Sequence, residues 1–181
     1  RALVKLLNPI SGSIQYLDTN IADFTSEQER AYRKKVQIIF QDPYGSLNPR
    51  KHIGAAIMEP MKVYKIGQND QERKEKVLEL LVKVGLEKDH FYYYPHEFSG
   101  GQRQRVSIAR TLAVEPEVII CDESVSALDV SIQAQVLNLL NDLKREFDLT
   151  YLFISHDLSV IKHFCDRILV MNKKGKIEER G

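Results

Sequence analysis

The stretch that decides the fold runs from Phe98 to Asp129 and reads FSGGQRQRVSIARTLAVEPEVIICDESVSALD. It holds a glycine pair at a helix start, an apolar run that ends in two acids, and a Ser-Ala-Leu-Asp turn. Serine followed three residues later by glutamine is capping-box spacing, so a helix is predicted from Ser99 to Val114. The apolar run after it predicts a buried strand. Helix and strand therefore alternate along this stretch.

The rest of the chain continues this alternation. Apolar runs predict buried strands at Val36–Phe40, Val118–Cys121 and Thr150–Ile154, with shorter strands at 12–17 and 167–172. Charged or amphipathic segments predict helices at 26–35, at 71–84 with Gly85 as its cap, and around 132–143. Strands separated by helices predict an α/β fold with a mostly parallel sheet. The helix-rich stretch 52–97 is predicted to be an inserted subdomain.

Composition limits the function classes. The 181 residues suit one domain, and 43% hydrophobic with 28% charged residues indicates a folded soluble chain. A net charge of +1 offers no excess of Lys and Arg, so no nucleic-acid partner is expected. Cys121 and Cys165 lie in apolar stretches without CxxC spacing and are predicted to be free, buried thiols. No apolar run approaches the ~18 residues of a membrane span.

Polar residues follow three of the predicted strands: Gln41, the pair Asp122 and Glu123, and His156. Ligands of open α/β sheets bind outside the carboxyl ends of the strands. One carboxylate there can hold Mg²⁺ and its neighbour can orient or deprotonate an attacking water, so Asp122 is assigned to the metal and Glu123 to the water. His156 can hydrogen-bond a phosphate or that water, and the amide oxygen of Gln41 can reach either Mg²⁺ or the water. Each of these residues, taken alone, is more often structural.

The segment Ser99-Gly100-Gly101-Gln102 is a candidate anion site. Unpaired N–H groups and the positive end of the helix dipole would face a ligand, and glycines allow close backbone approach. Ser99 could cap the helix or donate to a phosphate. A plain capped helix explains the same residues when they stand alone.

The order of these pieces is more specific than any one of them. Gln41, the S-G-G-Q segment, the strand with its two acids, the Ser-Ala-Leu-Asp turn and His156 follow one another as they do in the ATP-binding cassette (ABC) ATPases, which the chain resembles over its whole length. Gln41–Arg50 (QDPYGSLNPR) and Cys121–Val136 are similar to the dipeptide/oligopeptide (and nickel) importer ATPases. Ser124 stands where many cassettes have Pro, and Phe98 where Leu is common.

The resemblance implies a P-loop NTPase (RecA-like) fold and a use for each site residue. Two nucleotide-binding domains of the family pair head to tail, so the signature residues would contact ATP held by the partner subunit: Ser99, Gly100, Gly101 and Gln102. Four residues would serve ATP and Mg²⁺ held in the same subunit: Asp122, Glu123, Gln41 and His156. Asp129 of the D-loop would lie at the dimer interface. ATP-driven closure would power transmembrane permease subunits, and indirectly a solute-binding protein, at the cytoplasmic face of the membrane.

One family motif does not occur in the 181 residues: the Walker A loop, G-x-x-x-x-G-K-[ST]. Arg1–Leu7 reads as the tail of an amphipathic helix, and the resemblance implies that it is the helix after that loop. The expected fold is thus an N-terminally truncated RecA-like core of residues 1–41 and 115–181, with 42–114 as Q-loop, helical subdomain and signature helix. Because the Walker A loop supplies most phosphate contacts, this polypeptide alone is expected to bind ATP weakly and hydrolyse little. Apolar surface left uncovered by the truncation would favour association.

Two alternatives to an importer ATPase stay open. One is a soluble cassette ATPase that acts in translation or repair, and the other is a non-catalytic partner that only donates its signature motif. The Q-loop similarity favours the importer. Glu123 and His156 count against a purely donating partner, which would need neither. The transported solute cannot be read from these residues, and neither can homo- or heterodimer pairing or a parent with two fused cassettes.

Overall fold

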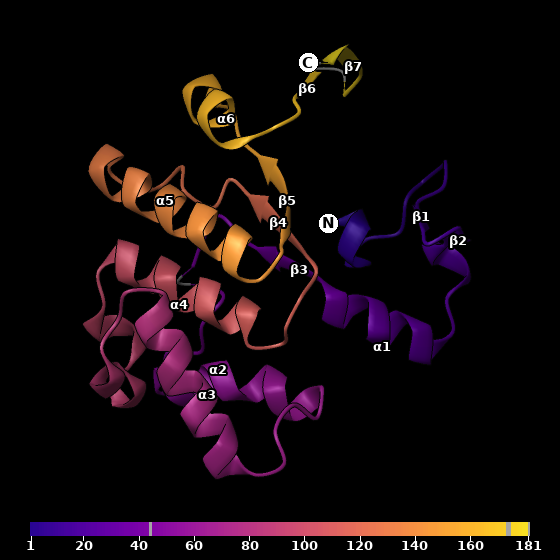
Figure 1. Ribbon diagram of the computed structural model, residues 1–181. Helices are drawn as coiled ribbons and strands as arrows, with labels where there is room; N and C mark the ends of the chain where they lie inside the picture. The colour runs from indigo at the N-terminus through magenta and orange to yellow at the C-terminus, as the bar shows by residue number, and fades with distance from the viewer. Residues whose placement is uncertain (44, 173–174, 181) are drawn as a thin grey trace.

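A three-stranded parallel sheet lies at the centre of the computed structural model, which describes residues 1–43, 45–172 and 175–180 (Figure 1). Its strands are adjacent in the order β3 (Val36–Ile39), β4 (Val118–Asp122) and β5 (Thr150–Ile154). A helical insertion connects β3 to β4, and α5 (Val130–Glu146) connects β4 to β5. The predicted α/β class, with a parallel sheet, is confirmed.

The central strand β4 contributes side chains to two separate cores, because its side chains alternate between the two faces of the sheet. Ile119 and Cys121 are fully buried against the helices on one face, among them α5. Ile120 points to the other face and packs in a smaller cluster with Val4 and Tyr32. Tyr32 belongs to α1 (Ser26–Lys35), whose bounds agree with the predicted helix.

The N-terminal region differs from the prediction. Instead of an amphipathic helix over 1–7, a short 3-10 helix, η1 (Ala2–Val4), ends at Lys5 in a left-handed conformation, and a single turn is too short to propagate as an α-helix. The expected strand at 12–17 is a tight hairpin of β1 (Gln15–Tyr16) and β2 (Thr19–Asn20). Its two turn residues both have positive φ, as a type I′ turn requires. η2 (Ile21–Asp23) follows and leads into α1.

The insertion is helical, as predicted, and comprises α2 (Ile53–Val63), α3 (Asp70–Lys83), two short 3-10 helices and α4 (Gly100–Leu112). The 3-10 helices are η3 (Lys88–Tyr92) and η4 (Pro95–Glu97). The predicted cap of α3 is confirmed: Gly85 has a φ of +74°, its N–H donates to the Val82 carbonyl, and the Leu86 N–H donates to the Leu81 carbonyl. The boundaries 41/42 and 114/115 between the core and the insertion stay a prediction.

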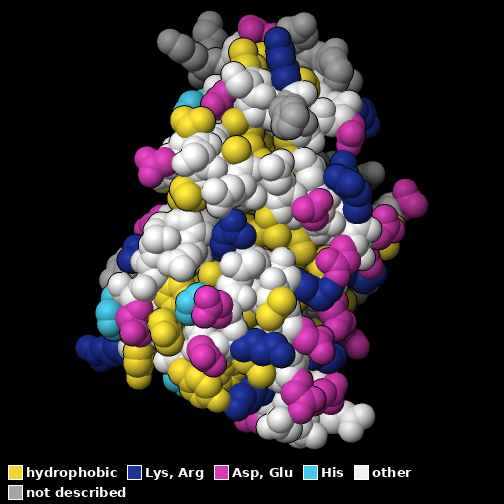
Figure 2. Space-filling model, turned by 60° about the vertical axis from the view of Figure 1, so that its left-hand side comes forward, with side chains coloured by type: hydrophobic (Ala, Val, Ile, Leu, Met, Phe, Trp, Pro, Cys, Tyr) yellow, Lys and Arg dark blue, Asp and Glu magenta, His cyan; other side chains and the backbone are white. Residues whose placement is uncertain are grey.

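Two surface features accompany this arrangement. Apolar side chains gather at the lower left of Figure 2. Within the insertion, Tyr92, Tyr93 and Tyr94 are exposed. Acidic and basic side chains are both scattered over the face that Figure 2 draws. On β5, the apolar side chains of Leu152 and Ile154 are 39% and 44% exposed. Surface uncovered by truncation, and association through it, stay predictions.

The C-terminal part contains a helix that the sequence pattern did not predict, α6 (Leu158–Phe164). Asp157 caps it by accepting a hydrogen bond from the Ser159 N–H at 2.8 Å. The predicted strand at 167–172 is β6 (Leu169–Met171), which pairs antiparallel with β7 (Ile177–Arg180). None of the helices that the structure describes is both long and apolar enough to span a bilayer.

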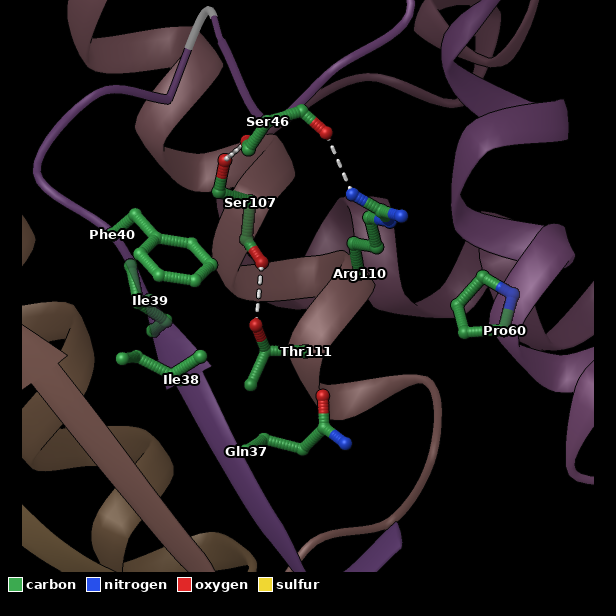
Figure 3. A pocket seen from close by; sticks show the side chains of 9 residues that line it. All are labelled: Gln37, Ile38, Ile39, Phe40, Ser46, Pro60, Ser107, Arg110 and Thr111. Carbon is green, nitrogen blue, oxygen red and sulfur yellow. Dashed lines mark hydrogen bonds between the residues drawn. The ribbon is translucent and has the colours of Figure 1, made fainter. Parts of the chain in front are cut away.

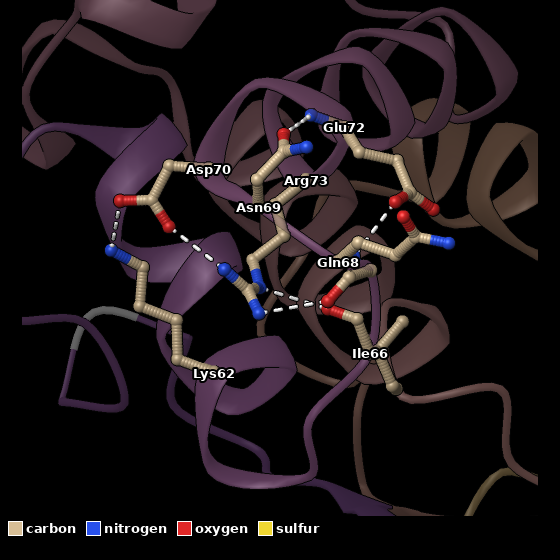
Figure 4. A network of polar contacts seen from close by, with 8 residues as sticks. Lys62, Ile66, Gln68, Asn69, Asp70, Glu72 and Arg73 are labelled. Carbon is tan, nitrogen blue, oxygen red and sulfur yellow. Dashed lines mark hydrogen bonds and ion pairs between the residues drawn. The ribbon is translucent and has the colours of Figure 1, made fainter.

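The α2–α3 turn is held by one arginine (Figure 4). Arg73 donates to the carbonyls of Ile66 and Gly67, both at 2.8 Å, and pairs with Asp70 at 2.9 Å. Asp70 also receives a bond from Lys62 at 2.7 Å, which ties the end of α2 to the start of α3. Only 15% of the Arg73 side chain is exposed, so these bonds are partly shielded from water.

Replacement of this arginine, Arg73→Ala, is expected to lower the free energy of unfolding by about 2 kcal/mol, because hydrogen bonds to a charged group contribute about 1.5–3 kcal/mol. Urea unfolding followed by circular dichroism measures the change. Arg145→Ala is the matched control, since Arg145 is 79% exposed and its pair with Asp142 is 3.8 Å long. Equal loss of stability in both variants would contradict the stabilising role of Arg73 in the α2–α3 turn.

The two thiols are predicted to differ in reactivity. Burial raises the pKa of Cys121 to about 12, and it also raises the pKa of Cys165, which is only half-buried, contrary to the expectation of two buried thiols. Since the thiolate is the reacting form, a thiol reagent should label Cys165 slowly and leave Cys121 unlabelled until the chain unfolds. Mass spectrometry of peptides from native and denatured samples checks this. Rapid native labelling of Cys121 would show that the core opens easily.

Candidate functional site

The register of the parallel sheet places the ends of three strands at one edge. Ile39 pairs with Cys121, and Asp122 pairs with Ile154, so the chain leaves β3, β4 and β5 at the same level. The residues that follow these strands therefore lie together, as expected for a parallel sheet. Gln41, Glu123 and His156, predicted from separate parts of the sequence, are brought to this edge.

Hydrogen bonds connect these residues in a row, through side chains and the backbone carbonyl of Glu123. His156 Nδ1 lies 3.2 Å from Glu123 Oε1. Ser126 donates from its hydroxyl to the Glu123 carbonyl at 2.9 Å, and Gln41 Nε2 donates to the Ser126 hydroxyl at 3.4 Å. The Glu123 side chain is 33% exposed and that of His156 is 72% exposed, so both remain accessible to a ligand.

The backbone of Glu123 is unusual, because its φ of +50° lies in the left-handed region that non-glycine residues seldom adopt. Two neighbours hold it there. The Glu123 N–H donates to the Ile154 carbonyl at 3.0 Å, and the Glu123 carbonyl accepts from the Ser126 N–H at 3.1 Å. Such a conformation costs about 1–3 kcal/mol and is concentrated at functional sites. Here it accompanies the contact of the carboxylate with His156.

Asp122 ends β4 and is partly buried. Its carboxylate and the amide oxygen of Gln41 are the hard oxygen donors that Mg²⁺ prefers. Among the described residues no three His, Cys, Asp or Glu side chains form a metal-binding group. The donor set fits a metal that takes one or two protein oxygens and completes its shell with phosphates and water.

The signature residues lie elsewhere, at the N-terminus of α4. The capping box is present: the Ser99 hydroxyl accepts from the Gln102 N–H at 3.3 Å, and Gln102 Oε1 accepts from the Ser99 N–H at 2.9 Å. Capping thus occupies the Ser99 hydroxyl in this structure. Gly100 is exposed, and a methyl group at its Cα would lie 3.8 Å from Leu128, so the helix start adjoins the Ser-Ala-Leu-Asp turn.

Asp129 is exposed and stands at the start of α5, where its side chain makes no capping bond. The next residue, Val130, is 83% exposed. This location leaves both side chains available to a partner, while the interface role of Asp129 stays a prediction.

Sequence reasoning missed the role of Ser126, which joins Gln41 to Glu123. The signal was its place as the first residue of the Ser-Ala-Leu-Asp turn, three residues after the acid. Ser124, which departs from the family pattern, is only 3% exposed, and the contact between Glu123 and His156 is formed beside it.

A cavity of about 210 Å³ lies beside the loop that follows Gln41, between β3, α2 and α4 (Figure 3). Arg110 donates to the Ser46 carbonyl at 2.7 Å, and the hydroxyls of Ser46 and Ser107 are 3.4 Å apart. These bonds attach the loop to the signature helix α4. The other side chains that line the cavity are Gln37, Ile38, Ile39, Phe40, Pro60 and Thr111.

Comparison with known proteins agrees with this geometry. A family model described as ABC transporter matches residues 1–126. Oligopeptide transport ATP-binding protein AppF of Bacillus subtilis (strain 168) is 53% identical over 94% of this chain and 52% of AppF. Dipeptide transport ATP-binding protein DppF of Escherichia coli (strain K12) is 47% identical over the whole chain and 54% of DppF. The chain thus spans about half the length of these relatives.

Solved structures show the same fold. CbiO1 from Clostridium perfringens, part of the ABC transporter complex CbiONQ, superposes with a TM-score of 0.84 at 27% identity over 99% of this chain and 69% of its own. The ATP-binding cassette MJ0796, solved as a dimer bound to ADP and Pi, gives 0.84 at 28% identity over 99% and 77%. Together with the family match over residues 1–126, this shows that the chain has the P-loop NTPase cassette fold and belongs to the ABC transporter family.

Proposed function

We propose that this chain is part of the ATP-hydrolysing subunit of an ABC importer for peptides. The observation that carries the proposal is the row of contacts from Gln41 through Ser126 and Glu123 to His156 at the carboxyl edge of the sheet. The names of AppF and DppF, which are oligopeptide and dipeptide transport ATP-binding proteins, support the substrate class.

In the proposed reaction, the Glu123 carboxylate orients the attacking water by accepting a hydrogen bond from it. The carboxylate is partly exposed, and its contact with His156 fixes its orientation. With Nδ1–H donating to Glu123, Nε2 of a neutral His156 can accept a hydrogen bond from the same water. When the ring is protonated, Nε2–H can instead donate to a phosphate oxygen. Gln41 and Asp122 supply oxygens to Mg²⁺. When bound, the metal would neutralise charge that develops on the phosphates.

The signature residues Ser99, Gly100, Gly101 and Gln102 are proposed to act on ATP held by a second nucleotide-binding domain. Their helix start presents backbone N–H groups and the positive end of the α4 dipole. Asp129 and Val130, both exposed beside it, would meet the same partner. The MJ0796 dimer, with ADP and Pi bound, supports pairing of two such domains.

Transmembrane permease subunits are the further proposed partners, with a solute-binding protein acting through them. The proposed contact lies at the cavity beside Ser46, because Ser46 accepts a hydrogen bond from Arg110 of α4 and lines this cavity together with β3. The subunit would then sit peripherally at the cytoplasmic face of the membrane.

The alternatives are less well supported. The peptide-transport relatives do not favour a soluble ATPase of translation or repair. A partner that donates only its signature motif would have no use for the contact between Glu123 and His156, which is formed here.

Removal of the catalytic carboxylate is the first test. In the full-length gene product, Glu123→Gln should lower ATP hydrolysis at least about 100-fold, because general acid–base groups contribute about 10²–10⁴-fold. ATP binding should persist. Glu146→Gln is the control, since Glu146 lies at the far end of α5. Uptake of labelled peptides should fall in parallel in cells that carry Glu123→Gln and should be kept in cells that carry Glu146→Gln. Unchanged uptake with Glu123→Gln would contradict the proposal.

The 181-residue chain alone should behave differently. Because the Walker A motif is absent from its sequence, phosphate release from Mg²⁺-ATP should stay near background, and ATP affinity should be weak. Malachite-green phosphate detection and equilibrium dialysis measure the two quantities. Turnover typical of cassette ATPases in this chain would show that its phosphate contacts come from residues other than that motif.

A further inference from the structure

The second glycine of the signature segment faces a crowded neighbour. A methyl group built at the Cα of Gly101 would lie 2.5 Å from Ile132 Cγ2, closer than atoms of this type approach one another. Ile132 belongs to the first turn of α5. The start of α4 is therefore seated on the start of α5 at a place where only glycine fits.

Ile132 has little room to move aside. A β-branched side chain in a helix strongly prefers one χ1 rotamer, so its Cγ2 cannot swing away without strain. The side chain is also partly buried and packs against the main core. The contact therefore acts as a stop that sets how closely the two helices approach.

The first glycine has no such constraint. A methyl group at Gly100 would find its nearest neighbour, Leu128 Cδ2, at 3.8 Å, which is ordinary van der Waals contact. Gly100 is exposed while Gly101 is partly buried. The two adjacent glycines thus differ in what surrounds them.

Arg105, one turn further along α4, bonds to both neighbouring helices. One guanidinium nitrogen donates to the Val84 carbonyl at the end of α3 at 2.7 Å, and another donates to Gln135 Oε1 on α5 at 3.3 Å. The arginine thereby limits rotation of α4 about its contact with Ile132. The close approach of Gly101 to Ile132 and the two hydrogen bonds of Arg105 together fix the direction of α4.

We infer that Gly101 is required first as the seat of α4 on α5, and that Ile132 is a positioning residue for the signature motif. Ile132 acts through Gly101 and touches no nucleotide itself. Since α5 begins directly after Asp129, the D-loop and the signature N–H groups would move as one body. The positioning role rests on the proposed ATPase function, whereas the packing role does not.

A double-mutant cycle in the 181-residue chain tests the packing. Gly101→Ala should increase the unfolded-to-folded ratio about tenfold in the wild-type background. In the Ile132→Ala background the same change should have little effect, since alanine has no Cγ2. Gly100→Ala is the matched control and should be tolerated, alone or with Ile132→Ala, without coupling. Additive effects of Gly101→Ala and Ile132→Ala in urea unfolding would overturn the inference.

Gly101→Ala, Ile132→Ala and the double variant in the full-length gene product test the positioning. Gly101→Ala should reduce kcat for ATP hydrolysis about 10–100-fold, because small misplacements of a phosphate contact are costly. The double variant, Gly101→Ala with Ile132→Ala, should recover most of the lost kcat. Coupling in the unfolding cycle without recovery of kcat in the double variant would overturn the positioning role, since Gly101 would then be needed at the phosphate itself. An inactive wild-type protein would contradict the proposed function. The packing role would still be tested by the double-mutant cycle in urea unfolding.

Discussion

The parallel register of β4 between β3 and β5 is the constraint on which the site depends. Asp122 pairs with Ile154, and the ladder extends one residue further through the Glu123 N–H, which donates to the Ile154 carbonyl. That bond holds Glu123 at a φ of +50° and coincides with the contact of its carboxylate with His156. A slip of one residue would move every side chain of β4 to the opposite face. It would exchange the residues that β4 places in the two cores and would displace the acids from Gln41 and His156.

The segment from the end of β4 to the first turn of α5 links both halves of the proposed chemistry. It carries the acids, Ser126 in the row of contacts to Gln41, Leu128 beside Gly100, and Ile132 against Gly101. The hydrolytic edge and the signature helix are therefore held by one short stretch of chain. This arrangement connects the carboxyl edge to the start of α4 through a single stretch of chain.

Much of the fold could be predicted because the responsible signals are local. Ser99 with Gln102 predicted the start of α4, Gly85 the end of α3, and apolar runs the three parallel strands. The prediction failed where the pattern was short. Leu3, Leu6 and Leu7 suggested a helix, yet Lys5 turns left-handed after one 3-10 turn, and α6 was missed although Asp157 caps it.

The sequence by itself determined the family, the order of the motifs and the chemical type of each site residue, because these depend on identity and spacing along the chain. Only the tertiary structure decided that Ser126 joins Gln41 to Glu123 and that Gly101 has no room for a methyl group beside Ile132. Ser126 lies 85 positions after Gln41 in the sequence (126 − 41), and Ile132 lies 31 positions after Gly101 (132 − 101). Contacts between residues so far apart in the sequence arise from sheet register and helix packing, and no local pattern of residues specifies them.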